Sequence, residues 1–311
     1  MIKSPVELSG ICGNQSQFLY VSRIIAQPHD QPHAILLTGP EHVGKRFGLY
    51  QILHSIPKQS SLDFLSLTPA EEKSTIGVDQ IRELQADISR RPLSGKYWVL
   101  IDDAALLTEE SANALLKVLE EPRTNCSFFL ITNSTERIPQ TIRSRCLAIQ
   151  FLPVATDEIA HWLRTINVSA GTARIIAAAA QGRPGIAFQY SSEPSSLSEW
   201  EERGRALCAL MGEPIHARLQ TVQTLLPAKS STAVTRLIIE QWLGIIRDIL
   251  LIQHHQRARI NIYAEATLES LSARISRGRI LNLARTLTRA FDMSDMPLQS
   301  KVLLENCVLS I

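Results

Sequence analysis

The sequence predicts a parallel α/β sheet domain followed by two helical domains. Three observations support this prediction. Short apolar runs alternate with helical periodicity as far as Pro153, and a glycine-rich turn follows the first of these runs. Beyond Pro153 the apolar spacing is helical throughout. We therefore predict an α/β domain over residues 1–153, a small helical domain over 154–194 and an all-helical domain over 195–311.

Five apolar runs are the expected strands. Nearly every position in them is apolar, which is typical of parallel strands covered on both faces. Between the second and third runs, Val78, Ile81, Leu84 and Ile88 have the spacing of one helix face. Crossover helices of this kind join parallel strands into a doubly wound sheet. The expected strands are residues 34–37, 63–67, 97–101, 127–131 and 147–151.

Capping residues and prolines mark the limits of several expected helices. Thr108 can accept a hydrogen bond from a free amide at the start of a helix whose first turn carries two glutamates, and Pro122 ends that helix. The polar stretch 191–198 contains Pro194 and is rich in serine, so we expect it to be a linker between the two helical domains.

The composition is that of an ordinary globular chain. Of its 311 residues, 45% are hydrophobic and 20% charged, and the net charge of +2 gives no overall field for nucleic acid or anionic lipid. The five cysteines are scattered singly, which predicts neither a zinc site nor a disulfide framework and favours a reducing cytoplasm. Residues 1–10 lack the apolar stretch of a signal peptide. Charged residues interrupt the apolar segment 237–253, so we expect an amphipathic helix there and no membrane span.

The turn after the first expected strand has the form of a phosphate-binding loop. Its residues GPEHVGKR, from Gly39 to Arg46, fit the pattern G-x-x-x-x-G-K-[ST] except at the last position. Gly44 permits a turn whose amides can face a phosphate, and Lys45 can reach the outer phosphate oxygens. The last residue should be a hydroxyl that binds Mg²⁺, but Arg46 offers no acceptor to a metal. We therefore expect ATP to bind weakly or not at all, and no hydrolysis of Mg-ATP.

Two acids follow the third expected strand. In phosphate-loop ATPases an acid at this place binds Mg²⁺ and a neighbouring glutamate orients the attacking water. Asp102 has the position for the first role, or it pairs with Arg46 or Lys45 where the metal would be. Asp103 is one methylene shorter than glutamate and fits the second role poorly. The alternative is that both acids are merely solvated at the end of a strand.

The fourth expected strand delivers two polar residues to the same edge of the sheet. Thr132 and Asn133 follow the run 127–131 directly. Because carboxyl ends of parallel strands meet at one edge, these side chains could sense a γ-phosphate bound there. Equally, they could simply end the strand.

Four stretches of the chain follow one another in a recognisable order. They are STIGVDQIREL at 74–84, DDAALLT at 102–108, NALLKVLEEP at 113–122 and IRSRC at 142–146. An alanine-leucine-leucine-lysine run followed by leucine-glutamate-glutamate-proline, together with a serine-arginine-cysteine motif, is a specific combination. In this order the stretches resemble the delta-prime family of subunits of the bacterial DNA polymerase III clamp loader, members of the AAA+ class.

This resemblance implies an AAA+ type sheet domain, a small helical lid and an all-helical collar that joins the assembly. It implies a heteropentameric loader, with ATP-hydrolysing motor subunits and a delta-type subunit as direct partners. The sliding clamp and primed DNA would be met through the assembly, and no membrane is involved. Delta-prime-like subunits have no working ATP site and donate the arginine of their serine-arginine-cysteine motif to ATP on a neighbour. The matching residue here is Arg145, an arginine finger acting in trans.

Two other functions remain open. An active AAA+ motor subunit of the same loader is disfavoured by Arg46, by Asp103 and by Gly185, which stands where motor subunits carry a lid arginine. The cysteine module that binds zinc in many relatives is absent, so we expect no zinc.

The other function is that of a DNA-binding adaptor. It could use a cluster of arginines near the carboxyl end, although the same cluster would suit a solvated helix face or a subunit contact. These arginines are at positions 274, 277, 279, 285 and 289.

Overall fold

A computed structural model describes most of the chain, and its contacts divide the chain into two units. The described residues are 10–26, 31–56, 61–70, 73–121, 125–225, 232–256, 260–294 and 300–311. The first unit comprises Met1–Trp162 and Gly182–Ile186, and the second comprises Leu163–Gln181 and Ala187–Ile311. Two of the three points of division fall inside helices, α6 (Thr156–Thr165) and α8 (Pro184–Ser192), and the third lies just ahead of α8. The three-domain scheme with its boundaries stays a prediction.

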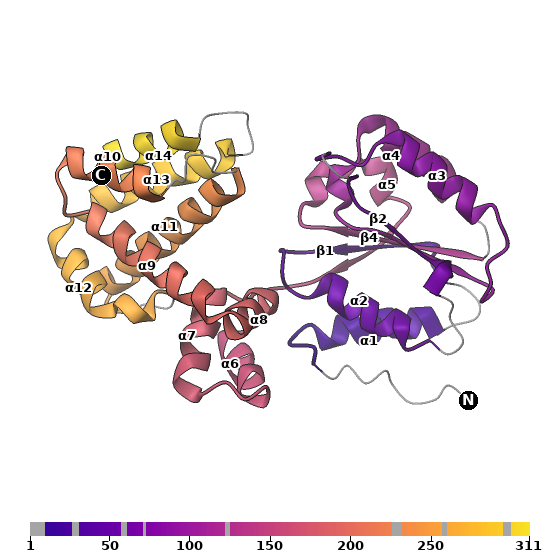
Figure 1. Ribbon diagram of the computed structural model, residues 1–311, viewed down its shortest axis with the longest axis horizontal. Coiled ribbons are helices and arrows are strands. Elements are labelled where there is room, and N and C mark those ends of the chain that lie inside the picture. The colour runs from indigo at the N-terminus through magenta and orange to yellow at the C-terminus, as the bar shows by residue number, and fades with distance from the viewer. Residues whose placement is uncertain are drawn as a thin grey trace. The chain divides into compact units, whose positions relative to one another are not determined.

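The first unit contains a parallel sheet whose strand order, among the described residues, is β2-β3-β4-β1-β5 (Figure 1). Every residue of β1, β3 and β4 is buried, as expected for strands covered on both faces. Each strand lies within one residue of its predicted limits, and the predicted parallel α/β fold is confirmed. The strands are β1 (Ala34–Thr38), β2 (Phe64–Leu67), β3 (Tyr97–Ile101), β4 (Cys126–Thr132) and β5 (Leu147–Gln150).

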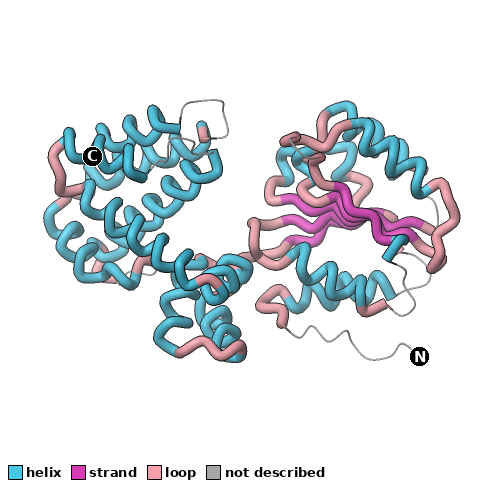
Figure 2. The backbone as a smooth tube through the Cα atoms, in the orientation of Figure 1, coloured by secondary structure: helices cyan, strands magenta, loops and turns pink. Residues whose placement is uncertain are grey.

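Helices cover both faces of this sheet (Figure 2). Successive side chains of a strand point to opposite faces, so Ile35 and Leu37 join one apolar core while Ala34 and Leu36 join the other. The first core holds helices α1 (Gln15–Ala26) and α2 (Lys45–His54). The second holds α3 (Val78–Ile88), α4 (Glu109–Glu120) and α5 (Gln140–Arg143).

Helix α4 begins as the sequence predicts. The hydroxyl of Thr108 accepts a hydrogen bond from the amide of Ser111 at 3.2 Å, and both glutamates lie in the first turn. The helix ends at Glu120, while the predicted terminator Pro122 lies outside the described residues. Leu115 and Leu119 are buried, so one face of α4 is fixed against the sheet.

The second unit is helical, as predicted. Helix α11 packs against α9, α12, α13 and α14, and its Trp242 is buried in the resulting core. In the described part of the chain, no helix has the length and apolar character needed to cross a membrane. The helices, beside α6 and α8, are α7 (Ala170–Ala180), α9 (Pro194–Leu210), α10 (Ile215–Leu225), α11 (Thr232–Gln253), α12 (Glu265–Arg274), α13 (Arg277–Met293) and α14 (Ser300–Leu309).

The predicted linker at 191–198 is wrong. Helix α8 continues to Ser192, and α9 begins at Pro194, so only Glu193 separates them. Proline suits the first position of a helix because the amide that it lacks has no partner there. The serines that follow Pro194 belong to the first turns of α9. A composition typical of a linker therefore also suits a helix start.

One charge of α11 is buried. Asp248 is fully buried, and its carboxylate accepts hydrogen bonds from the amide of Ile260 at 3.1 Å and from the amide of Asn261 at 2.7 Å. The side-chain amide of Asn261 donates a third at 3.1 Å. Buried backbone donors need such acceptors. Asp248 therefore fixes the chain ahead of α12 and does not belong to a solvated face.

Candidate functional site

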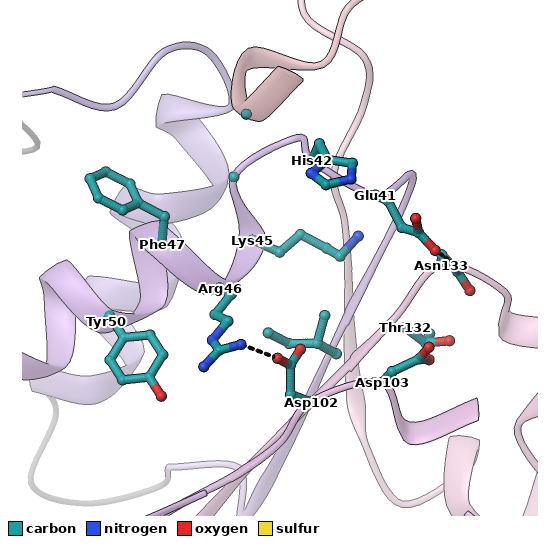
Figure 3. Close-up of a pocket in the computed structure, with 13 residues that line it drawn as sticks. Glu41, His42, Lys45, Arg46, Phe47, Tyr50, Asp102, Asp103, Thr132 and Asn133 are labelled. Carbon is teal, nitrogen blue, oxygen red and sulfur yellow. Dashed lines mark hydrogen bonds and ion pairs between the residues drawn. The ribbon is translucent and has the colours of Figure 1, made fainter. Parts of the chain in front are cut away.

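The carboxyl edge of the sheet carries a pocket of about 650 Å³ (Figure 3). The loop after β1, the residues after β3 and the end of β4 all contribute, because the carboxyl ends of parallel strands share one edge. The structure thus brings most of the predicted phosphate-site residues together. Those that line the pocket are Gly44, Lys45, Arg46, Asp102, Asp103, Thr132 and Asn133.

The backbone of the phosphate loop depends on its two glycines. Gly39 has a φ of +134°, and a Cβ there would lie 2.2 Å from the carbonyl oxygen of Phe151. Gly44 precedes α2 with a φ of +96°, and a Cβ there would have no atom within 4 Å, so only the dihedral angle demands glycine. The loop therefore keeps the strand–loop–helix arrangement of a phosphate loop.

Lys45 is bound to the loop itself. Its ammonium donates to the carbonyl oxygen of Gly39 at 2.5 Å and to that of Pro40 at 2.6 Å. The residue is buried, with 6% of its surface exposed. Burial lowers the pKa of Lys45 to about 8, although three nearby carboxylates act in the opposite direction. To reach a phosphate, this ammonium must first leave the carbonyl groups that it now binds.

Arg46 forms an ion pair with Asp102, the carboxylate that has the position to bind a metal. Its guanidinium lies 2.7 Å from Asp102 and above the ring of Tyr50, 5.4 Å from the ring centre. The predicted possibility that Asp102 pairs with Arg46 is confirmed. An arginine at position 46 therefore has two effects. The hydroxyl that would bind Mg²⁺ at this position is missing, and the carboxylate of Asp102, the second oxygen ligand, is neutralised.

Three other polar residues of the pocket, Asp103, Thr132 and Asn133, also have partners within the chain. Asp103 has a left-handed backbone, and its carboxylate accepts a hydrogen bond from the amide of Ala105 at 3.3 Å. Burial raises the pKa of this carboxyl. Thr132 is buried and bonds to the backbone of Ser134, whereas the amide of Asn133 donates to the carboxylate of Glu41 in the phosphate loop. Asp103 is therefore a capping residue, and neither acid is merely solvated.

Gly185 lies against the phosphate loop. Its amide donates to the carbonyl oxygen of His42 at 2.8 Å, and a Cβ at Gly185 would lie 3.1 Å from that oxygen. The position where motor subunits carry a lid arginine thus holds a close backbone contact in this chain. The sequence analysis did not predict this contact. The Arg-Pro-Gly run at the start of α8 was the available sign that the backbone comes close to another segment here.

Arg145 lies at the opposite edge of the sheet. It precedes β5, and Leu147 at the start of β5 pairs with Ile35 at the start of β1. Gly39 follows Ile35 by four residues, a distance of roughly 13 Å along a strand. The side chain of Arg145 is 37% exposed and does not line the pocket. This location agrees with the prediction that Arg145 is clear of its own phosphate loop.

Three contacts hold the Arg145 side chain. Nη2 lies 2.7 Å from a carboxylate oxygen of Glu120, and Nη1 donates to the carbonyl oxygen of Thr141 at 3.0 Å and to the hydroxyl of Ser144 at 3.5 Å. The next residue, Cys146, is partly buried, and burial raises the pKa of its thiol to about 11. A thiol with so high a pKa is unreactive at neutral pH. The arginine is therefore the group of this motif that is chemically available.

Known proteins with similar sequences are subunits of bacterial DNA polymerase III. A family model described as DNA polymerase III, delta subunit, matches residues 51–155. The DNA polymerase III subunit delta' of Escherichia coli (strain K12) is 30% identical over 221 residues, which are 70% of this chain and 64% of that protein. The chain resembles delta-prime subunits of bacterial DNA polymerase III. The subunit delta' of Haemophilus influenzae is 36% identical over 143 residues, 45% of this chain and 43% of that protein.

The match to these delta-prime subunits covers less than two thirds of their length. Relatives of another kind also match. The DNA polymerase III subunit gamma of Buchnera aphidicola subsp. Schizaphis graminum is 38% identical over 121 residues, 39% of this chain and 32% of that protein. A solved gamma subunit-related protein of Thermotoga maritima has a TM-score of 0.48 at 19% identity, covering 94% of this chain and 97% of its own.

Proposed function

We propose that this chain is a non-motor subunit of the bacterial DNA polymerase III clamp loader. In this role it helps to load the sliding clamp on primed DNA and donates Arg145 to the ATP site of a neighbouring motor subunit. Its direct partners are the motor subunits and a delta-type subunit. The observation that carries the proposal is the contrast between the two sheet edges. In the pocket, Lys45 binds backbone carbonyl groups and Arg46 pairs with Asp102, while Arg145 lies outside the pocket at the far edge and is 37% exposed.

The pocket supports the absence of ATP hydrolysis. Binding of Mg-ATP would require Lys45 to leave two carbonyl oxygens and Asp102 to leave Arg46. Asn133 would have to leave Glu41 before it could approach a γ-phosphate. Even then the metal would lack its hydroxyl ligand at position 46. Each of these contacts opposes the chemistry that the loop pattern would otherwise serve.

Arg145 has the properties of a donor in trans. Its guanidinium is planar and permanently charged, so it can meet the charge that develops on a phosphate during transfer. The sheet separates it from its own phosphate loop, so a nucleotide that it contacts belongs to another subunit. With 37% of its side chain exposed, it is accessible to that subunit.

A second candidate function is an active motor subunit of the same loader, favoured by the similarity to a gamma subunit and by the presence of Lys45 and Asp102. ATP turnover by the highly purified chain separates the two functions. Turnover that Lys45→Ala abolishes would establish the motor subunit and overturn our proposal. We expect no turnover above background in either protein.

The arginine finger is tested in loaders assembled from wild-type motor subunits and variants of this chain. We expect Arg145→Ala to leave assembly intact and to lower ATP hydrolysis stimulated by DNA and the clamp, together with clamp loading. Trans arginines contribute about 10³–10⁵ in rate at one site; the total loss is smaller because the other sites continue to work. Arg145→Lys should restore little, since an ammonium lacks the planar fork.

The matched control for this test is Arg143→Ala. Arg143 is exposed, lies in the same turn and has the same charge. Equal losses in the two variants would show that net charge, not a finger, is what the loader requires. Unchanged hydrolysis and loading with Arg145→Ala would refute the role of Arg145.

A further inference from the structure

Two motifs that are far apart in the sequence meet at the amino edge of the sheet. Glu120 belongs to the leucine-glutamate-glutamate-proline run and is the last residue of α4. Arg145 belongs to the serine-arginine-cysteine motif. A carboxylate oxygen of Glu120 lies 2.7 Å from Nη2 of Arg145, although 25 residues separate the two. The motifs that identify the family are thus parts of one contact.

Helix stability does not explain a glutamate at this place. The carboxyl end of a helix carries partial negative charge, so an acidic side chain there is unfavourable for the helix by itself. Glu120 is also half-exposed and contributes little to the core. A cation beside it removes the unfavourable interaction, and Arg145 is that cation. The position of Glu120 is therefore best explained by its partner.

The elements that carry the contact are fixed by the fold. Helix α4 is capped by Thr108 and is anchored by the buried Leu115. Helix α5 is anchored by Ile142, which is fully buried. Nη1 of Arg145 binds the carbonyl oxygen of Thr141 in α5, while Nη2 binds Glu120 in α4. These contacts with two anchored elements determine the plane of the guanidinium, and the hydroxyl of Ser144 accepts a weaker bond from Nη1 at 3.5 Å.

We propose that Glu120 is a positioning residue that orients the Arg145 guanidinium toward the ATP of the neighbouring subunit; this inference rests on the function proposed above. An arginine side chain has five N–H donors, so donors remain for phosphate oxygens when Glu120 and Thr141 each accept one. A side chain that is already oriented loses less conformational freedom when the neighbour's nucleotide arrives. Glu120 thereby raises the rate at the neighbour's site without contacting the nucleotide.

The test uses loaders assembled with wild-type motor subunits, with Arg145→Ala as a reference and four further variants of this chain. We expect Glu120→Ala to lower kcat for DNA- and clamp-stimulated ATP hydrolysis by about threefold to tenfold, within the range for a misplaced catalytic group, with KM for ATP unchanged. Glu120→Gln keeps an acceptor oxygen and should lie between Glu120→Ala and the wild type. Glu121→Ala is the matched control, because Glu121 is the adjacent exposed glutamate of the same motif; it should leave kcat unchanged. Assembly, measured by size-exclusion chromatography, should be normal in every variant.

The fourth variant combines Glu120→Ala with Arg145→Ala and should be no slower than Arg145→Ala alone. A second readout is rescue of the Arg145→Ala loader by millimolar guanidinium. We expect the half-saturating guanidinium concentration to rise when Glu120 is also replaced, because the carboxylate that binds the cation is gone. A role of Glu120 in folding alone would not change that concentration.

Several results would overturn the inference. A faster loader with Glu120→Ala would show that Glu120 restrains Arg145 and does not orient it. An equal loss from Glu120→Ala in the wild-type and Arg145→Ala backgrounds would place its effect elsewhere. If Arg145→Ala slows the loader and Glu120→Ala does not, this inference fails while the proposed function stands. If Arg145→Ala has no effect, the proposed function fails first and this inference fails with it.

Discussion

The carboxyl edge and the amino edge of the same sheet both carry charged residues, but these residues differ in their surroundings. At the carboxyl edge, Lys45, Arg46 and Asp102 bind groups of their own chain, and Lys45 is buried. At the amino edge, Arg145 is also bound to its own chain but stays more than one third exposed. Exposure alone does not separate the two arginines, because the Arg46 side chain is 54% exposed. The edges differ because Arg46 neutralises an acid of the nucleotide pocket, whereas Arg145 lies outside that pocket. On this contrast we propose that the functional arginine lies at the edge that lacks the nucleotide motif.

The largest expected difference between the edges is in the assembled loader. We expect Lys45→Ala to leave DNA- and clamp-stimulated ATP hydrolysis within about twofold of the wild type, while Arg145→Ala lowers it by at least tenfold at the affected site. The measurement is steady-state hydrolysis by loaders that differ only in this chain. A loss with Lys45→Ala as large as that with Arg145→Ala would break the comparison, since both edges would then take part in catalysis.

The next effect concerns the glycines of the phosphate loop. Gly39→Ala places a Cβ 2.2 Å from a backbone oxygen at a φ of +134°, so we expect it to lower the free energy of unfolding by about 2–4 kcal/mol. Gly44→Ala meets no neighbour and should cost about 1 kcal/mol. Urea denaturation of the two variants gives the comparison. Equal losses would show that dihedral strain alone, without the contact to Phe151, fixes the loop.

Stability should also depend on the titration of Lys45. Its pKa is about 8 in the folded chain, below the ordinary value of 10.5, so the unfolded chain binds more protons between these pH values. Stability therefore rises with pH in that window, by about 1–2 kcal/mol from pH 7.5 to 9.5. The measurement is urea denaturation of the wild type and of Lys45→Met at both pH values. The wild type should gain stability relative to the variant, and a constant difference would contradict a buried ammonium.

The smallest expected effect is the coupling between Arg46 and Asp102. The Arg46 side chain is 54% exposed, so a double-mutant cycle with Arg46→Ala and Asp102→Ala should give about 0.5 kcal/mol. Raising the salt concentration should reduce it further. A coupling free energy of several kcal/mol would contradict this expectation. It would show that the Arg46–Asp102 pair contributes strongly to the stability of the folded chain.

Local sequence patterns predicted the sheet, because parallel strands that are buried on both faces are apolar at almost every position. The expected strands differ from β1–β5 by at most one residue at either end. The same local reasoning failed at 191–198, where Pro194 opens a helix. Proline and serine occur both in linkers and in first helical turns, so composition alone cannot separate the two.

The contacts within the site were harder to predict than its members. Residue types and spacing gave Lys45 and Asp102, the family resemblance gave Arg145, and the chemistry of Arg46 suggested that Asp102 pairs with Arg46 or Lys45. The contact between Asn133 and Glu41 joins residues 92 positions apart, and that between Glu120 and Arg145 joins residues 25 positions apart. Such pairs depend on strand order and helix packing. Buried Asp248 escaped prediction for the same reason, since its partners lie across a connecting segment.

The close approach of Gly39 to Phe151 has a consequence for how sequences of this kind are classified. A side chain at Gly39 would collide with a carbonyl group of the sheet whether or not a nucleotide is ever bound. Natural selection on folding alone can therefore retain the first glycine of a phosphate loop long after the loop has ceased to serve an ATPase. A signature search that scores this glycine as a sign of nucleotide binding counts a packing requirement as a catalytic one. The residue at position 46 shows better than any glycine whether such a loop still serves an ATPase or is kept only for packing.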